Sequence, residues 1–111
     1  MLKDALWLML PPSKPDDVYD WCAKKGEPLL HSFDRLEEAG AVRGGFGSLI
    51  YFFKEWDESP EMYGILAHEI AHVVWDIFEF RGIEEAKNHE VFAYLTNNLT
   101  ERVIHALRKH V

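Results

Sequence analysis

Cysteine is almost absent from this sequence, since Cys22 is the only one among 111 residues. A single cysteine excludes a disulfide framework and a metal site built from several thiolates. Long hydrophobic runs are also missing. The apolar stretch of residues 5–10, "ALWLML", is far shorter than the roughly 20 residues of a membrane span and too short for a secretory signal. These absences predict a protein of the reducing cytoplasm that does not enter a membrane.

Positive charge is scarce as well. The chain has 12 Lys and Arg residues against 19 Asp and Glu residues, which gives a formal net charge of -7. Modules that bind nucleic acid usually carry a basic patch, so this balance argues against a nucleic-acid partner. Nearly half of the residues are hydrophobic, which argues against disorder. We expect a single domain over residues 1–111, and the sequence does not indicate its oligomeric state.

Strand and turn signals dominate the first half of the chain. The run "ALWLML" predicts a strand that ends at Pro11 and Pro12. The segment "DDVYDWCAKKG" predicts a helix that stops at Gly26. The glycine-rich "EEAGAVRGGFG" predicts a turn and a short strand, and "SLIYFF" at residues 48–53 predicts another strand.

Two long helices are expected in the second half. Ser59 is a favourable N-cap, Pro60 suits the first helical position, and Gly82 marks the end of the first helix. The second is expected from about Glu84 to about Lys109. The fold class is therefore α+β: a small sheet of about three strands, an N-terminal helix and two long C-terminal helices.

The motif "HEIAH" lies on the first of these two helices. His68 and His72 are four residues apart, so both imidazoles lie on one face and can reach a single tetrahedral Zn²⁺. Glu69 lies about 100° round the helix, where it can act as the general base towards a water molecule. No Lys or Arg lies between Lys54 and Arg81, although a helix face in contact with solvent usually carries some. The pattern therefore favours a metal site over the alternative, a solvent-exposed polar stripe.

A third ligand is expected from the last helix. Glu90 is the strongest candidate, because it shares a polar stripe with Tyr94 and would face the two histidines if both helices buried their apolar sides in one core. His89 is the competing ligand, and a glutamate in a first helical turn is also favoured by the helix dipole alone. Asp76, one turn beyond His72, is either a hydrogen-bond partner for an imidazole N–H or an exposed acid.

The stretch "LAHEIAHVVWDIFEFRG", followed by "NHEVFAYLTNNL", resembles the gluzincins, thermolysin-like zinc metallopeptidases with an HExxH helix and a glutamate ligand on the next helix. It is also similar to small phage-encoded HExxH proteins and to the single-domain minigluzincins. The resemblance covers residues 46–107. It implies a zincin-like minimal domain with zinc at His68, His72 and Glu90, and with Glu69 as the base.

Two further features follow from the resemblance. The strand at residues 48–53 corresponds to the zincin edge strand that holds an extended peptide substrate. Tyr94 stands where thermolysin-like enzymes have an aspartate, one turn beyond the third ligand. Tyr94 then either polarises the substrate carbonyl, orients Glu90 or belongs to the core.

The expected function is a zinc-dependent metallopeptidase, in which Glu69 is the general base for hydrolysis of a peptide bond. The alternative is a catalytically inactive zincin-like binding or regulatory module that keeps the zinc for stability. No second subdomain supplies a residue to stabilise the oxyanion, and a structural metal is common in small domains. A third possibility has no metal, and the helix pair is an interaction surface. The sequence does not indicate the substrate or the cleavage preference.

Overall fold

The computed structural model describes residues 5–30, 33 and 37–110. The chain divides into two compact units, Met1–Trp56 and Asp57–Val111. The prediction of an α+β chain with three strands is confirmed. The prediction of a single domain over residues 1–111 stays a prediction.

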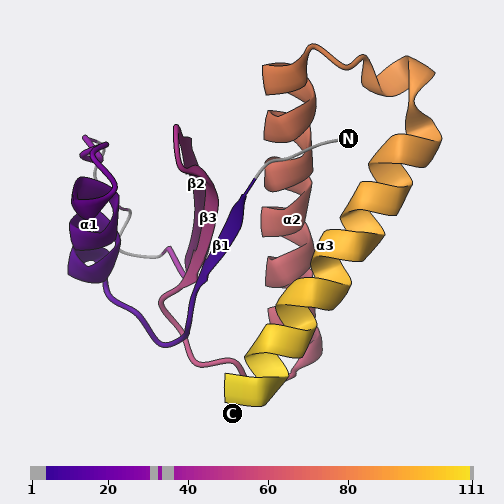
Figure 1. Cartoon of the computed structure of the whole chain (residues 1–111). Helices are drawn as coiled ribbons and strands as arrows, with labels where there is room; N and C mark the ends of the chain where they lie inside the picture. Colours follow the sequence, from indigo (N-terminus) through magenta and orange to yellow (C-terminus); the bar gives the residue numbers. More distant parts are fainter. Residues whose placement is uncertain (1–4, 31–32, 34–36, 111) are drawn as a thin grey trace. The chain divides into compact units, whose positions relative to one another are not determined.

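The first unit holds the sheet and one helix. Its elements are β1 (Leu6–Met9), α1 (Pro15–Lys24), β2 (Ala39–Gly44) and β3 (Gly47–Phe52) (Figure 1). The strand order is β1-β3-β2, in which β3 pairs parallel with β1 and antiparallel with β2. The central strand is therefore β3.

This order corrects one expectation. The strand at 48–53 was expected at the edge of the sheet, where an extended peptide would pair with it. In the structure Ile50 pairs with Leu8 on one side and with Ala41 on the other. Both backbone edges of β3 are occupied, so a substrate cannot add alongside this strand.

Glycine shapes the turn between β2 and β3. The backbone of Gly47 has φ +105°, and a Cβ there would lie 2.3 Å from the carbonyl oxygen of Ala5. The N–H of Gly45 donates to Glu27 Oε1 at 2.6 Å, and a Cβ on Gly45 would lie 2.4 Å from the same oxygen. Glycine is needed at position 47 because its φ is left-handed and a side chain would meet a backbone oxygen, whereas at position 45 the flexible Glu27 side chain could move aside.

A small core joins α1 to the sheet. Val18 and Cys22 are four residues apart on α1, and both are buried against Leu49 and Tyr51 of β3. Aromatic rings surround this core, with Trp21 edge-on to the ring of Phe46 at a centroid distance of 4.8 Å. The helical spacing of the two buried residues in α1 explains why this segment packs as a helix on the strand.

The second unit is a helical hairpin of α2 (Pro60–Arg81) and α3 (His89–His110), joined through the 3₁₀ turn η1 (Glu85–Lys87) (Figure 1). The predicted boundaries of α2 are confirmed. Ser59 Oγ accepts a hydrogen bond from the N–H of Met62 at 3.2 Å, and Gly82 ends the helix at φ +68°. No helix in the described part of the chain is long and apolar enough to cross a membrane.

The last helix begins later than predicted. A continuous helix from about residue 84 was expected, but Asn88 has φ -138° and ψ 44° and interrupts it. The Asn88 side-chain Nδ2 donates to the carbonyl of Glu84 at 2.8 Å, and the Asn88 carbonyl accepts from the N–H of Phe92 at 3.0 Å. Asparagine competes with the helix in this way because its side chain bonds to nearby backbone groups.

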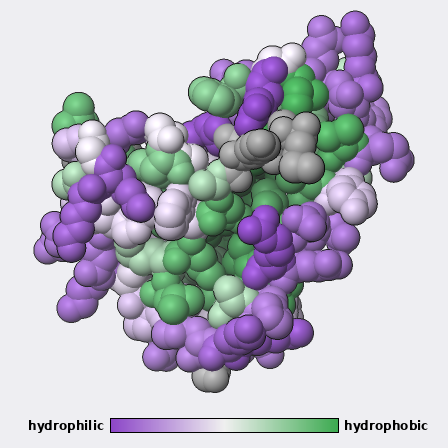
Figure 2. Space-filling view, viewed as in Figure 1, coloured by the Kyte–Doolittle hydropathy of each residue, from purple (hydrophilic) through white to green (hydrophobic). Residues whose placement is uncertain are grey.

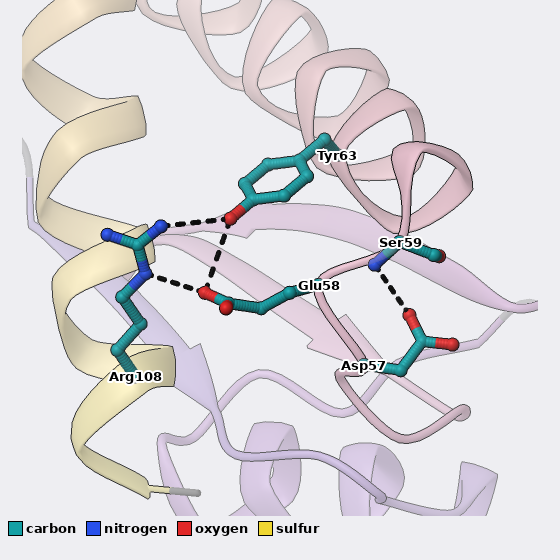
Figure 3. A network of polar contacts seen from close by, with 5 residues as sticks. All are labelled: Asp57, Glu58, Ser59, Tyr63 and Arg108. Atoms are coloured by element: carbon teal, nitrogen blue, oxygen red, sulfur yellow. Dashed lines mark hydrogen bonds and ion pairs between the residues drawn. The ribbon is translucent and has the colours of Figure 1, made fainter.

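Two contacts fix how α2 and α3 are aligned. Near the connection, the ring of Phe78 meets that of Phe92 edge-on at a centroid distance of 5.4 Å. At the other end, Arg108 donates to Glu58 at 2.6 Å and to the hydroxyl of Tyr63 at 3.1 Å (Figure 3). The helices are therefore antiparallel.

In the space-filling view, hydrophilic residues cover most of the surface over α3 (Figure 2).

Candidate metal centre

The two histidines of the HEIAH motif converge in the structure. We call His68 and His72 the His pair. Their Nε2 atoms are 3.1 Å apart, and their rings meet edge-on at a centroid distance of 4.7 Å with 77° between the ring planes. Both side chains are exposed. The prediction that one turn of helix brings these imidazoles together is therefore confirmed at the level of geometry.

The spacing of the His pair fits a zinc ion. Two ligands that lie at roughly 2.0–2.1 Å from a tetrahedral zinc are about 3.3 Å from each other. A separation of 3.1 Å needs only a small side-chain adjustment to reach that value. Without a metal, the same distance suits a hydrogen bond in which one neutral imidazole N–H donates to the other ring. The spacing of the pair thus suits either a hydrogen bond between the two rings or a metal ion bound by both.

The flanks of the pair carry the predicted acids. Glu69, the expected general base, is 7% exposed, whereas the histidines beside it are exposed. Asp76 lies one turn beyond His72 and is half-buried. Among the described residues it makes no hydrogen bond to an imidazole, so the role of orienting His72 stays a prediction.

The structure does not bring Glu90 to the His pair. Phe92 contacts Phe78 of α2, and Glu90 precedes Phe92 by two residues, so it points to the opposite side of α3, about 200° round. The alignment of the hairpin also places Glu90 across from about residue 80. That level is about 12 Å along the axis from His72. The side chain of Glu90 is exposed.

Tyr94 and His89 lie apart from the pair as well. Tyr94 follows Phe92 by two residues, on the side of α3 that is turned away from α2, and is 77% exposed. This exposure excludes the core role that was its alternative. His89 is the first residue of α3 and is also exposed. Within the described ranges, no group of three or more His, Cys, Asp or Glu side chains is placed to hold a metal ion.

Among the described residues, the His pair makes no hydrogen bond or ring contact of its own to α3. On α2 the ring contacts and hydrogen bonds to α3 come from Tyr63, Trp75 and Phe78. His72 lies about 180° round the helix from Tyr63 and about 120° from Phe78. Trp75, about 60° round the helix from His72, lies between the His pair and α3 and contacts both His72 and Phe92. Of the predicted ligands, the structure brings together His68 and His72.

The sequence motifs did not single out Trp75, which lies beside the His pair. Its side chain is 48% exposed, and its ring lies edge-on to that of His72 at a centroid distance of 6.2 Å. Trp75 Nε1 donates to Glu85 Oε2 at 3.1 Å. The sequence does indicate this position of Trp75, because on a helical projection it lies about 20° from His68 and so borders the polar stripe.

Comparisons with protein-family models, with characterised proteins and with solved structures find no match to this chain. The resemblance to the gluzincins therefore depends on the segments "HEIAH" and "HEVFAY" alone. The geometry described above is the remaining support for a metal centre.

Proposed function

We propose that this chain is a zinc-dependent metallopeptidase and that α2 is its metal-binding helix. The observation that carries the proposal is the convergence of His68 Nε2 and His72 Nε2 to 3.1 Å within the H-E-x-x-H spacing. Two neutral imidazoles that present lone pairs to one point are suited to zinc. Glu69 follows His68 directly in the sequence, about 100° round the same helix.

The two histidines and the glutamate of the HEIAH motif each have one role in the proposed hydrolysis. The His pair binds the metal through its Nε2 atoms, and a bound zinc ion supplies Lewis-acid activation of water and of the peptide carbonyl. Glu69 accepts a proton from the attacking water and returns it to the amine nitrogen as the carbon–nitrogen bond breaks. Glu69 is 7% exposed, so its carboxylate is largely shielded from bulk water.

Glu90 and Tyr94 belong to the proposal through the resemblance. Catalytic zinc usually has three protein ligands and one open position. For Glu90 to be the third, the first turns of α3 would have to rotate and to slide towards His72. Tyr94 would need the same movement before it could approach a substrate carbonyl.

The test measures metal content and peptidase activity on the same preparations. Purified wild-type protein is expected to contain about one zinc per chain by mass spectrometry and to cleave casein or a mixed peptide library. Glu69→Gln is expected to keep the zinc and to lose the activity, because the amide cannot accept the proton. Glu101→Gln, an exposed substitution on α3, is the matched control. A Glu69→Gln protein as active as wild type contradicts the mechanism.

A second function is favoured by the position of Glu90. His68 and His72 lie near each other, whereas Glu90, the expected third ligand, lies on the far side of α3. A metal bound by the His pair alone would serve to stabilise a binding or regulatory module. In that case EDTA lowers the Tm, and Glu69→Gln leaves partner binding intact. Zinc-loaded protein without hydrolytic activity towards any peptide would favour this second function.

A further inference from the structure

Trp75 lies beside the His pair and has no role in the proposed hydrolysis. Although it is 48% exposed, three contacts fix its ring. Its Nε1–H donates to Glu85, its edge meets His72 at 6.2 Å, and it packs at a tilt on Phe92 at 6.3 Å. A large ring that is held in place yet left half in water is typical of a binding surface.

The position of Trp75 suits a peptide that lies along the polar stripe of α2. Trp75 and Glu79 project about 20° to either side of His68, on the same stripe as the His pair. They follow His72 along the axis by about 4.5 Å and 10.5 Å. An extended peptide advances about 3.3 Å per residue. A side chain one to three residues from a carbonyl at the His pair therefore reaches this tryptophan and this glutamate.

The surroundings of Trp75 are negative. Glu85 is bonded to its ring nitrogen, Glu79 is exposed one turn further along, and no Lys or Arg lies between Lys54 and Arg81. The same chain shows what an indole can hold, since Lys25 Nζ lies 4.0 Å from the centroid of the Trp7 ring. Among the described residues, no cation occupies the corresponding place on Trp75.

We propose that Trp75, Glu79 and Glu85 form a subsite for a cationic side chain of a peptide, arginine above all. A guanidinium group stacks on an indole face while its N–H groups reach neighbouring carboxylates. The negative charge of this part of α2 complements a basic substrate. This inference rests on the proposed function, because it assigns the substrate class of the same site: peptides with a basic residue close to the scissile bond.

The test measures binding of two labelled peptides by fluorescence anisotropy. They share the blocked sequence Ala-Ala-X-Ala-Ala, where X is arginine or its neutral isostere citrulline. The zinc-loaded Glu69→Gln protein is used so that bound peptide is not cleaved. It is expected to bind the arginine peptide about three- to tenfold more tightly than the citrulline peptide. Trp75→Leu and Glu79→Gln, each combined with Glu69→Gln, are expected to abolish most of this preference.

Glu101→Gln in the same background is the matched control and should keep the full preference. Trp75 is half exposed, so Trp75→Leu is expected to fold, and circular dichroism checks this. Equal affinity for both peptides, no measurable binding of the arginine peptide, or an unchanged preference in Trp75→Leu overturns the subsite. Cleavage by wild type without a basic preference leaves the hydrolase standing and refutes the subsite. If the protein binds the arginine peptide selectively through Trp75 but wild type cleaves no peptide, the subsite stands and the hydrolase is refuted.

Discussion

Zinc should stabilise the helical hairpin through the His pair, and His72→Ala should remove most of that effect. The two Nε2 atoms already stand 3.1 Å apart, close to the roughly 3.3 Å of two ligands on one tetrahedral zinc. Little rearrangement is therefore needed for both rings to bind. Once one imidazole holds the ion, the second binds it intramolecularly, an advantage of about 10²–10⁴ in affinity.

The expected magnitude follows from mass action. At free zinc of a hundred times the wild-type Kd, binding stabilises the folded unit by about 2.7 kcal/mol. If His72→Ala raises the Kd about a hundredfold, the same zinc concentration gives about 0.4 kcal/mol. For a unit of this size the wild-type Tm should rise by about 10–20 °C and that of the variant by about 2–3 °C.

Scanning calorimetry with and without zinc measures these shifts, and a cobalt titration followed by visible absorbance gives the affinity independently. His105→Ala is the matched control, because His105 is an exposed histidine on α3 outside the pair. It should keep the wild-type shift. If His72→Ala keeps the wild-type zinc shift, the His pair is not the metal site.

The same assay decides the role of Glu90. In the hairpin described above, Glu90 lies about 12 Å along α2 from His72 and on the far side of α3. We therefore expect Glu90→Ala to bind zinc as tightly as wild type. A loss as large as that of His72→Ala would mean that α3 changes its alignment when the metal binds, and would restore the three-ligand site of the gluzincin pattern.

Four further predictions concern stability. Gly82→Ala should cost about 1 kcal/mol, because its φ of +68° disfavours a side chain although the space is open. Gly47→Ala should cost about 3 kcal/mol or more, because a Cβ would also meet a backbone oxygen at 2.3 Å; urea unfolding measures both, and equal losses would refute the reasoning. Leu107→Ala, at a fully buried position, should cost about 2–5 kcal/mol by the same assay. Burial raises the pKa of the Cys22 thiol above its ordinary 9.0. The buried neutral thiol should therefore stabilise the fold below pH 9, and this stabilisation should be lost as the pH rises through the pKa of the folded state. Alkylation at pH 9 should therefore be much slower in folded than in unfolded protein.

Local signals made the helix ends predictable. Ser59, Pro60 and Gly82 act through bonds and dihedral angles within a few residues, and each is found where the sequence places it. The start of α3 was harder because the amide of Asn88 offers the backbone an alternative bond to Glu84. That competition depends on side-chain geometry that periodicity does not describe.

The His pair was predictable and the third ligand was not, for a related reason. Four residues along a helix always form one turn, so His68 and His72 had to be neighbours. Glu90 was assigned by a stripe on a different helix, and a stripe does not say which side meets a partner. The contact of Phe92 with Phe78 decides that question, and it turns Glu90 away from α2.

The strand order contained a signal of its own. All six residues of β3 are buried, and the sequence "SLIYFF" shows no alternation of polar and apolar residues. Such a run is typical of a strand covered on both faces, whereas β1 and β2 contain partly exposed positions. A central place for β3 follows more naturally from this pattern than an edge. A peptide that pairs with this sheet must therefore use the outer edge of β1 or β2, whereas the subsite proposed at Trp75 needs no strand pairing.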